Sequence, residues 1–127
     1  MLLGVSMLLG ACATAATLVS RPLDSGTSME FTVPAPQLAE VTKKALVGLN
    51  LPITSATPNG PSTVINFEKS MTAFSWGEVG RVVVTPVSDT SSRVFVDTEK
   101  RSQMQITGTS EAEFARDIFD AIKMRLP

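Results

Sequence analysis

Residues 78–99 read EVGRVVVTPV (78–87), SDTSS (88–92) and RVFVDTE (93–99), and they determine the architecture of the chain. The first part is rich in β-branched valine, which favours extended backbone, and the second is a cluster of turn-forming residues. The third part alternates, so that Val94 and Val96 share one face. Two strand-forming segments joined by a polar turn predict a β-hairpin, and therefore an antiparallel sheet.

Further strands are predicted on both sides of this hairpin. Residues 29–33 place Met29, Phe31 and Val33 on one face, as in a half-buried strand. Residues 51–57 and 63–71 form two more candidates. The turn signal Pro58-Asn59-Gly60-Pro61 separates them, and Ile65, Phe67 and Met71 share a face of the second. Residues 103–107 either extend the hairpin or add an edge strand.

Two helices are predicted, one near each end of the strand-rich region. In residues 36–49 the apolar side chains recur at helical spacing, Asn50 is a C-cap candidate, and Pro52 prevents continuation. The second helix begins with the capping box Ser110-Glu111-Ala112-Glu113. Its apolar side chains repeat at intervals of four residues, and they are Phe114, Ile118, Ile122 and Leu126.

This order of elements predicts an α+β fold. We expect a two-layer domain at residues 29–127, with an antiparallel sheet of four to five strands and two helices on one face, in the order β-α-β-β-β-β-α.

Composition excludes several classes of function. The chain has 127 residues, with 11 basic and 12 acidic side chains, so it lacks the basic excess of nucleic-acid binders. It contains no His and one Cys. Triads that need His, zinc sites built from His or several Cys, and an intramolecular disulfide are therefore excluded. We expect no metal and no cofactor.

The first twenty residues differ from the rest, because they carry no charge and fourteen of them are hydrophobic. The apolar run is too short to span a bilayer but suits the core of a secretory signal. Leu9-Gly10-Ala11-Cys12 resembles the lipobox of bacterial lipoproteins. That resemblance implies that residues 1–11 are a signal peptide and that Cys12 is the lipid attachment site and mature N-terminus. The alternative is a buried apolar helix with an inert core cysteine.

Two further expectations follow from this resemblance. Secretory signals begin with basic residues, and none precedes the apolar run, so we expect the natural start to lie upstream. Ala13 follows the cysteine where an Asp often retains lipoproteins at the inner membrane, which favours the periplasmic side of the outer membrane. Residues 12–28 are then a lipidated tether with a reach of about 50 Å at 3.3 Å per residue.

Candidate contact residues lie between two strands, where Met71, Phe74 and Trp76 form an apolar aromatic group. Exposed, this group would bind a protein partner or an apolar ligand; alternatively, Trp76 closes the end of the core.

The charged and glycine-rich segments do not predict a catalytic, metal or phosphate site. The helix acids Glu113, Asp117 and Asp120 are expected to form a solvated face rather than a catalytic or metal site. The mixed cluster Asp97-Thr98-Glu99-Lys100-Arg101 is expected to be a solvated strand edge. The segment Gly77-Glu78-Val79-Gly80 lacks the further residues of a phosphate loop.

The sequence therefore predicts a lipid-anchored envelope lipoprotein with a non-catalytic binding or scaffolding role. Its partner would be an envelope protein. One alternative is a small domain that binds a lipid or other apolar ligand between sheet and helix, and another is a His-free hydrolase. Two-layer folds of this kind recur both in small envelope lipoproteins and in helix-grip ligand binders, so the fold does not choose between these functions.

Overall fold

The computed structural model of the chain describes residues 21–69, 78–100 and 111–127. Its elements follow one another in the predicted order β-α-β-β-β-β-α, which confirms the α+β class. They are β1 (Thr27–Phe31), α3 (Ala35–Gly48), β2 (Ile53–Asn59), β3 (Ser62–Lys69), β4 (Glu78–Pro86), β5 (Ser92–Lys100) and α4 (Glu111–Arg125). The strand expected at 103–107 and the N-cap expected at Ser110 lie outside the described residues.

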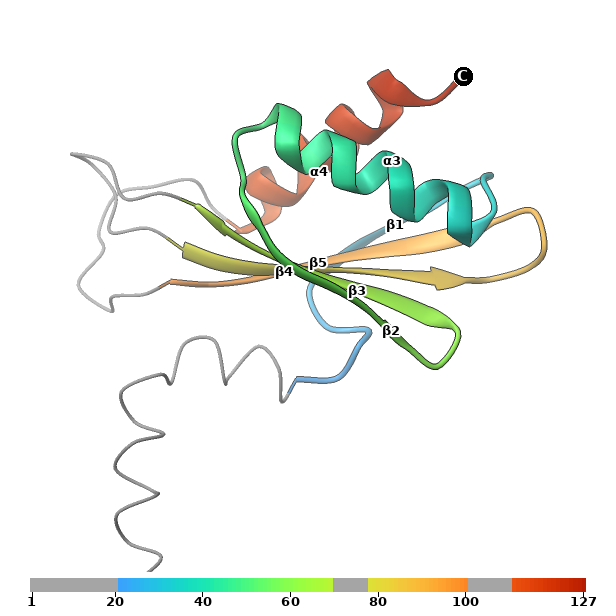
Figure 1. The fold of residues 1–127 in the computed structure, drawn as a ribbon, viewed down its shortest axis with the longest axis horizontal. Helices are drawn as coiled ribbons and strands as arrows, with labels where there is room; N and C mark the ends of the chain where they lie inside the picture. Colours follow the sequence, from blue (N-terminus) through green and yellow to red (C-terminus); the bar gives the residue numbers. More distant parts are fainter. Residues whose placement is uncertain (1–20, 70–77, 101–110) are drawn as a thin grey trace, which may run out of the picture.

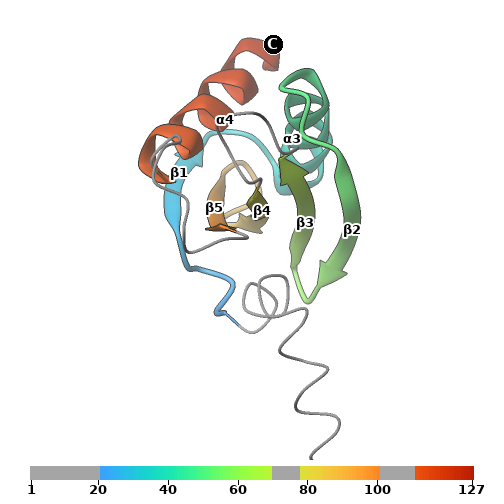
Figure 2. The ribbon, with the colours of Figure 1, turned by 90° about the vertical axis from the view of Figure 1, so that its left-hand side faces the viewer.

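The five strands form one antiparallel sheet in the order β1-β5-β4-β3-β2. Strands β2 to β5 follow each other as a meander, while β1 pairs with β5 at the opposite edge. Both helices cover the same face of the sheet, and residues 21–26 lie on the other side (Figure 1). The first and last strands are neighbours, so the N-terminal segment reaches the sheet beside β5 (Figure 2).

The β4–β5 hairpin has the predicted inward face. Its register runs from Glu78 opposite Lys100 to Pro86 opposite Ser92, and residues 87–91 connect the strands. The Val87 and Ser88 N–H groups donate to the Ser91 carbonyl at 3.0 and 3.1 Å. The inward side chains are fully buried, and they are Val82, Val84, Val94 and Val96.

The β2–β3 hairpin is tighter than the turn signal predicted. Strand β2 continues through Pro58 to Asn59, and β3 begins at Ser62, so the connection is only Gly60-Pro61. Gly60 has φ +60°, a conformation that costs glycine little. Pro58 is tolerated because β2 is an edge strand, where a missing N–H need not break a ladder.

Helix α3 ends as the sequence predicted, at a left-handed Asn50 with φ +61°. The Leu51 N–H donates to the Leu46 carbonyl at 3.0 Å, and the Asn50 N–H donates to the Val47 carbonyl at 3.0 Å. These two bonds form a Schellman motif, and Leu46 and Leu51 are both buried, as the motif's usual apolar contact requires. The motif turns the chain from the helix layer down to the edge of the sheet.

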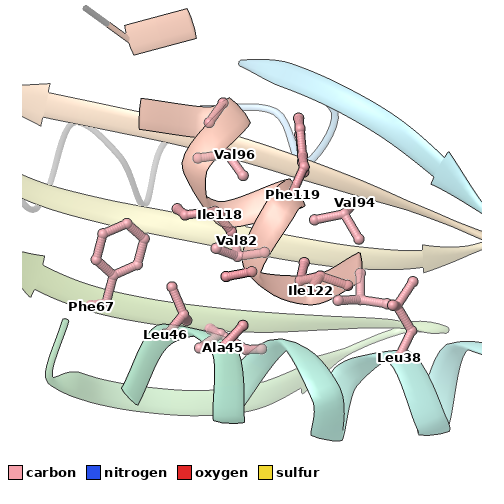
Figure 3. Close-up of a cluster of buried hydrophobic side chains, with 14 of the residues drawn as sticks. Leu38, Ala45, Leu46, Phe67, Val82, Val94, Val96, Ile118, Phe119 and Ile122 are labelled. Atoms are coloured by element: carbon pink, nitrogen blue, oxygen red, sulfur yellow. The ribbon is translucent and has the colours of Figure 1, made fainter. Parts of the chain in front are cut away.

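The core lies between the sheet and the two helices, and its side chains interlock (Figure 3). The α4 stripe is buried as predicted, although Leu126 is only partly buried. Phe67 meets Phe114 edge to face, with centroids 5.8 Å apart at 75°. Gly80 stands opposite Phe67 on β4, and a Cβ there would overlap the Phe67 ring. Glycine at this position therefore makes room for the aromatic pair.

Candidate functional site

A charged cluster lies on the face of the sheet opposite the helices. Arg81 on β4 stands directly opposite Asp97 on β5, and their residues are 2% and 3% exposed. Their sequence neighbours Val82 and Val96 point into the core, so alternation places the two charges on the other face. The charged cluster also includes groups from the N-terminal segment, β5 and α4, and its members are Arg21, Ser25, Arg81, Asp97, Glu99 and Glu111.

The N-terminal segment supplies the acceptors for the Arg81 guanidinium. Nη1 donates to the Arg21 carbonyl at 3.1 Å, and Nη2 donates to the Pro22 carbonyl at 2.6 Å. Nη2 also donates to the Ser25 Oγ at 3.0 Å. These bonds attach residues 21–25 to the middle of the sheet.

The carboxylates of β5 bind the same segment. Asp97 Oδ1 accepts from Arg21 Nη1 at 2.8 Å, and Asp97 Oδ2 accepts from the Ser25 Oγ at 2.7 Å. Arg21 also pairs with Glu99. Arg81 Nη2 and Asp97 Oδ2 are 3.9 Å apart, so the Ser25 hydroxyl links the two buried charges.

Gly26 allows this close approach. It has φ +93°, and a Cβ there would overlap the Val96 carbonyl. β1 starts at Thr27, two residues before the predicted strand. The segment at residues 21–26, which precedes β1, is bonded to the sheet.

The pKa values of the two arginines are shifted in opposite directions, because burial outweighs ion pairing for Arg81 and ion pairing outweighs burial for Arg21. Burial lowers the pKa of Arg81, the Asp97 carboxylate opposes that change, and the nearby Arg21 charge adds to it. For Arg21, burial acts to lower the pKa, but Asp97 and Glu99 outweigh it and raise the pKa.

Glu111 brings a third carboxyl group to the cluster from the first turn of α4. The residue is exposed as a whole, but its carboxyl group contacts Asp97 and accepts from the Thr98 N–H. Burial raises the pKa of Glu111, and the hydrogen bond and charge of Asp97 raise it further, against the opposing effects of Thr98 and Arg21. Burial and the Asp97 carboxylate therefore both favour the protonated form of Glu111, which can donate to Asp97.

The structure corrects two predictions of the sequence analysis. The tether expected at residues 12–28 is wrong for residues 21–28, because Arg21 and Ser25 are bonded to the sheet and β1 begins at Thr27. Asp97 is not part of a solvated strand edge, because it is buried and bonded to Arg21 and Ser25. The side chain of Glu99 is 22% exposed and pairs with Arg21. The Lys100 side chain and Arg101 lie outside the described residues. The expectation was wrong because the N-terminal segment covers this part of β5, a contact that no local pattern encodes.

The other candidate residues have different outcomes. Glu113, Asp117 and Asp120 are exposed on α4, as predicted for a solvated face. Cys12, Met71, Phe74 and Trp76 all lie outside the described residues, as does the predicted signal peptide at residues 1–11.

Sequence reasoning missed Arg81 and Arg21 as partners of Asp97. The sequence held a signal for Arg81, because it lies between Val79 and Val83 on one face of the strand. A charged side chain on a buried strand face needs a partner of opposite charge. The register set by the 87–91 connection places Asp97 opposite it. No comparable signal existed for Arg21, which approaches from outside the hairpin.

A second feature lies at the ends of the helices, where α3 and α4 meet. Val47 is 63% exposed and Met124 is 82% exposed. Beside Val47 is a shallow, open hollow of about 380 Å³, lined by Val47, Asn50, Leu51 and Pro52. The Arg125 guanidinium covers Gly48 and donates to the Ala121 carbonyl at 3.2 Å. We call this feature the helix-end surface; it consists of Lys44, Val47, Asn50, Pro52, Met124 and Arg125.

In residues 21–69, 78–100 and 111–127, acidic and sulfur side chains nowhere form a group of three that could bind a metal ion. Within these same ranges, every helix is too short or too polar to cross a bilayer.

Comparison with models of protein families found none that matches the chain. Comparison with curated proteins found no matching relative.

Proposed function

We propose that the chain is a lipid-anchored bacterial envelope lipoprotein whose α+β domain binds or scaffolds a partner without catalysis. It would reside on the periplasmic side of the outer membrane, attached through Cys12. The observation that carries this proposal is Leu9-Gly10-Ala11-Cys12 at the end of an uncharged apolar run. Lipid attachment through two or three acyl chains makes anchoring stable, since each buried CH₂ contributes about 0.8 kcal/mol.

The charged cluster supports a defined mechanical link between anchor and domain. Arg21, Pro22 and Ser25 are bonded to β4 and β5, so a tether that starts at Cys12 can extend no further than residue 20. Eight residues reach at most about 26 Å at 3.3 Å per residue. The domain would therefore stay closer to the bilayer than a tether of residues 12–28 would allow.

The pairing of buried charges supports a non-catalytic role. Arg81 and Asp97 both bond to the Ser25 hydroxyl, and Arg81 also donates to two backbone carbonyls. Buried charges with hydrogen-bond partners of this kind are typical of a structural network. Glu113, Asp117 and Asp120 on α4 are exposed, as on an ordinary solvated helix face.

Met71, Phe74 and Trp76 are proposed contacts for the partner or for an apolar ligand, on the basis of their sequence alone. Titration of the full chain with phospholipid vesicles while following Trp76 fluorescence tests the ligand alternative. A blue shift that saturates would support an apolar ligand, and an unchanged spectrum would favour a protein partner.

Intact-mass measurement of the native protein from membranes tests the anchor. We expect a chain that begins at Cys12 and carries a diacylglyceryl group and an N-terminal acyl chain. A chain that retains Met1 with a free Cys12 thiol would refute the proposal. The matched control is Cys12→Ser, which should keep the signal and lose the acyl mass while the domain folds normally.

A further inference from the structure

The position of the charged cluster determines which side of the domain faces the bilayer, provided that the proposed anchor is correct. Residues 21–26 leave the sheet on the side opposite the helices (Figures 1 and 2). The cluster bonds this segment to β4 and β5, so it cannot swing around the sheet without breaking at least the Arg81 and Asp97 contacts. An anchor at Cys12 therefore joins the domain on the side of the sheet that is opposite the helices.

The helix-end surface lies on the side that faces away. Val47 and Met124 are large apolar side chains that remain exposed. Val47 precedes Gly48 and Met124 precedes Arg125, and Gly48 and Arg125 contact each other. The hollow beside Val47 is also lined by the left-handed Asn50, by Leu51 and by Pro52, so the Schellman motif defines its backbone shape. A preformed apolar recess needs little ordering to accept a side chain.

The charge around this surface is positive. Lys44 precedes Val47 by one helical turn, and Lys123 and Arg125 flank Met124. Across the parts of the chain that the structure describes, these three cations have no ion-pair partner, whereas Lys43 is paired with Glu40 at 2.8 Å. Asp120, one turn before Met124, is the nearby acid on α4.

The helix dipole explains only part of this charge. Lys123 and Arg125 lie in the last turn of α4, where cations are favoured in any helix. Lys44 lies before the last turn of α3, on its exposed face and one turn after Glu40, so the dipole does not account for it. Exposed apolar groups surrounded by positively charged side chains are complementary to an acidic, amphipathic partner.

We propose that the helix-end surface binds an acidic protein segment that inserts an apolar side chain into the hollow beside Val47. This inference rests on the proposed anchor for its geometry, because an anchor on the opposite side of the sheet keeps the protein's own bilayer away from this surface. It names the binding surface and the chemistry of the partner, which the proposed function leaves open.

Fluorescence anisotropy with the full chain tests the binding chemistry. The probe is a labelled amphipathic peptide of leucine and glutamate, with a leucine and lysine peptide as its charge-reversed match and vesicles of anionic phosphatidylglycerol as the membrane probe. We expect binding of the acidic peptide alone. The double change Lys44→Glu and Arg125→Glu should weaken it by at least about tenfold, as should Val47→Asp. Thr90→Glu, in the exposed β4–β5 turn, is the control and should leave binding unchanged.

Three outcomes would overturn the proposal. They are no binding of the acidic peptide, equal binding by the Val47→Asp and Thr90→Glu variants, and preferential binding of vesicles that Lys44→Glu abolishes. Circular dichroism of each variant establishes that loss of binding is not loss of fold.

A photocrosslinking residue at position 47, introduced into the full chain in native membranes, tests the partner directly. Mass mapping of the crosslinked peptide should give a segment with net negative charge and an apolar residue at the crosslink. A basic or uncharged segment, or crosslinks to lipid, would contradict the inference. The peptide assay does not require lipidation, so failure of the anchor and failure of the binding surface give separate results.

Discussion

Replacing Asp97 by alanine should destabilise the domain strongly. The change leaves Arg81, which is 2% exposed, without its cross-strand carboxylate, and it removes the 2.8 Å bond to Arg21 and the 2.7 Å bond to Ser25. Breaking a buried charge pair by removing one partner costs about 3–5 kcal/mol. For a domain of this size the midpoint of thermal unfolding should fall by at least about 12 °C, at 4 °C per kcal/mol.

A double-mutant cycle separates the pair from its surroundings. Arg81→Met should also destabilise the domain but by less, because Asp97 stays buried and loses one cation while it keeps its 2.8 Å bond to Arg21. The double variant Arg81→Met/Asp97→Ala should be more stable than the sum of the two losses predicts, by about 2 kcal/mol, since each single change removes the same interaction between the two buried charges. Urea unfolding followed by circular dichroism measures each free energy.

The exposed pair Glu30–Arg93 provides the matched control. It spans the neighbouring strands β1 and β5 at 2.9 Å, but its side chains are 47% and 39% exposed. Arg93→Ala should therefore cost less than about 1 kcal/mol. If Asp97→Ala also cost less than 1 kcal/mol, or if the Arg81 and Asp97 losses were additive, the buried cluster would not stabilise the fold as argued.

Further predictions concern the pH dependence, the aromatic pair and the helix cap. The raised pKa of Glu111 means that the folded protein binds its proton more tightly than the unfolded chain does, so its contribution becomes unfavourable as pH rises. Glu111→Gln should gain free energy of unfolding relative to the parent chain as pH rises above about 4.3, the ordinary pKa of glutamate, and Asp117→Asn, on the exposed face, is the comparison in urea titrations. Gly80→Ala should cost about 1–3 kcal/mol because its Cβ overlaps the Phe67 ring, and less in a Phe67→Leu background, by thermal unfolding. Asn50→Val should cost about 1–2 kcal/mol at φ +61°, while Asn50→Gly should equal or exceed the parent stability.

Most of the fold could be predicted because its determinants are local. These determinants involve residues that are close in sequence. They are the turn at residues 87–91, the capping residue Asn50 and the four-residue repeat of α4. Element order then follows from their sequence, and the short connections require an antiparallel meander. Boundaries shifted by a residue or two where pairing overrides propensity, as when β2 extends through Pro58 at the sheet edge.

The charged cluster could not be predicted because its contacts join distant parts of the chain. Asp97 contacts Arg21 across 76 residues and Ser25 across 72 residues. The alternation around Asp97 correctly indicates which face it occupies, but that face has no apolar pattern to show what covers it. Local composition favours a solvated edge there, and only the pairing of β1 with β5 brings the covering segment into place.

That pairing also changes where the domain begins. The acceptors that the Arg81 guanidinium uses at Arg21, Pro22 and Ser25 all precede β1. A domain that started at residue 29 would lose all three, together with the Arg21 charge that balances Asp97 and Glu99. Because β4 and β5 are central to the sheet, the cost would fall on the two strands with the most buried side chains rather than on an edge. Residues 21–26 are therefore a structural part of the domain, and a pulling force applied at Arg21 would act on the contacts with Arg81 and Asp97 before it acted on β1.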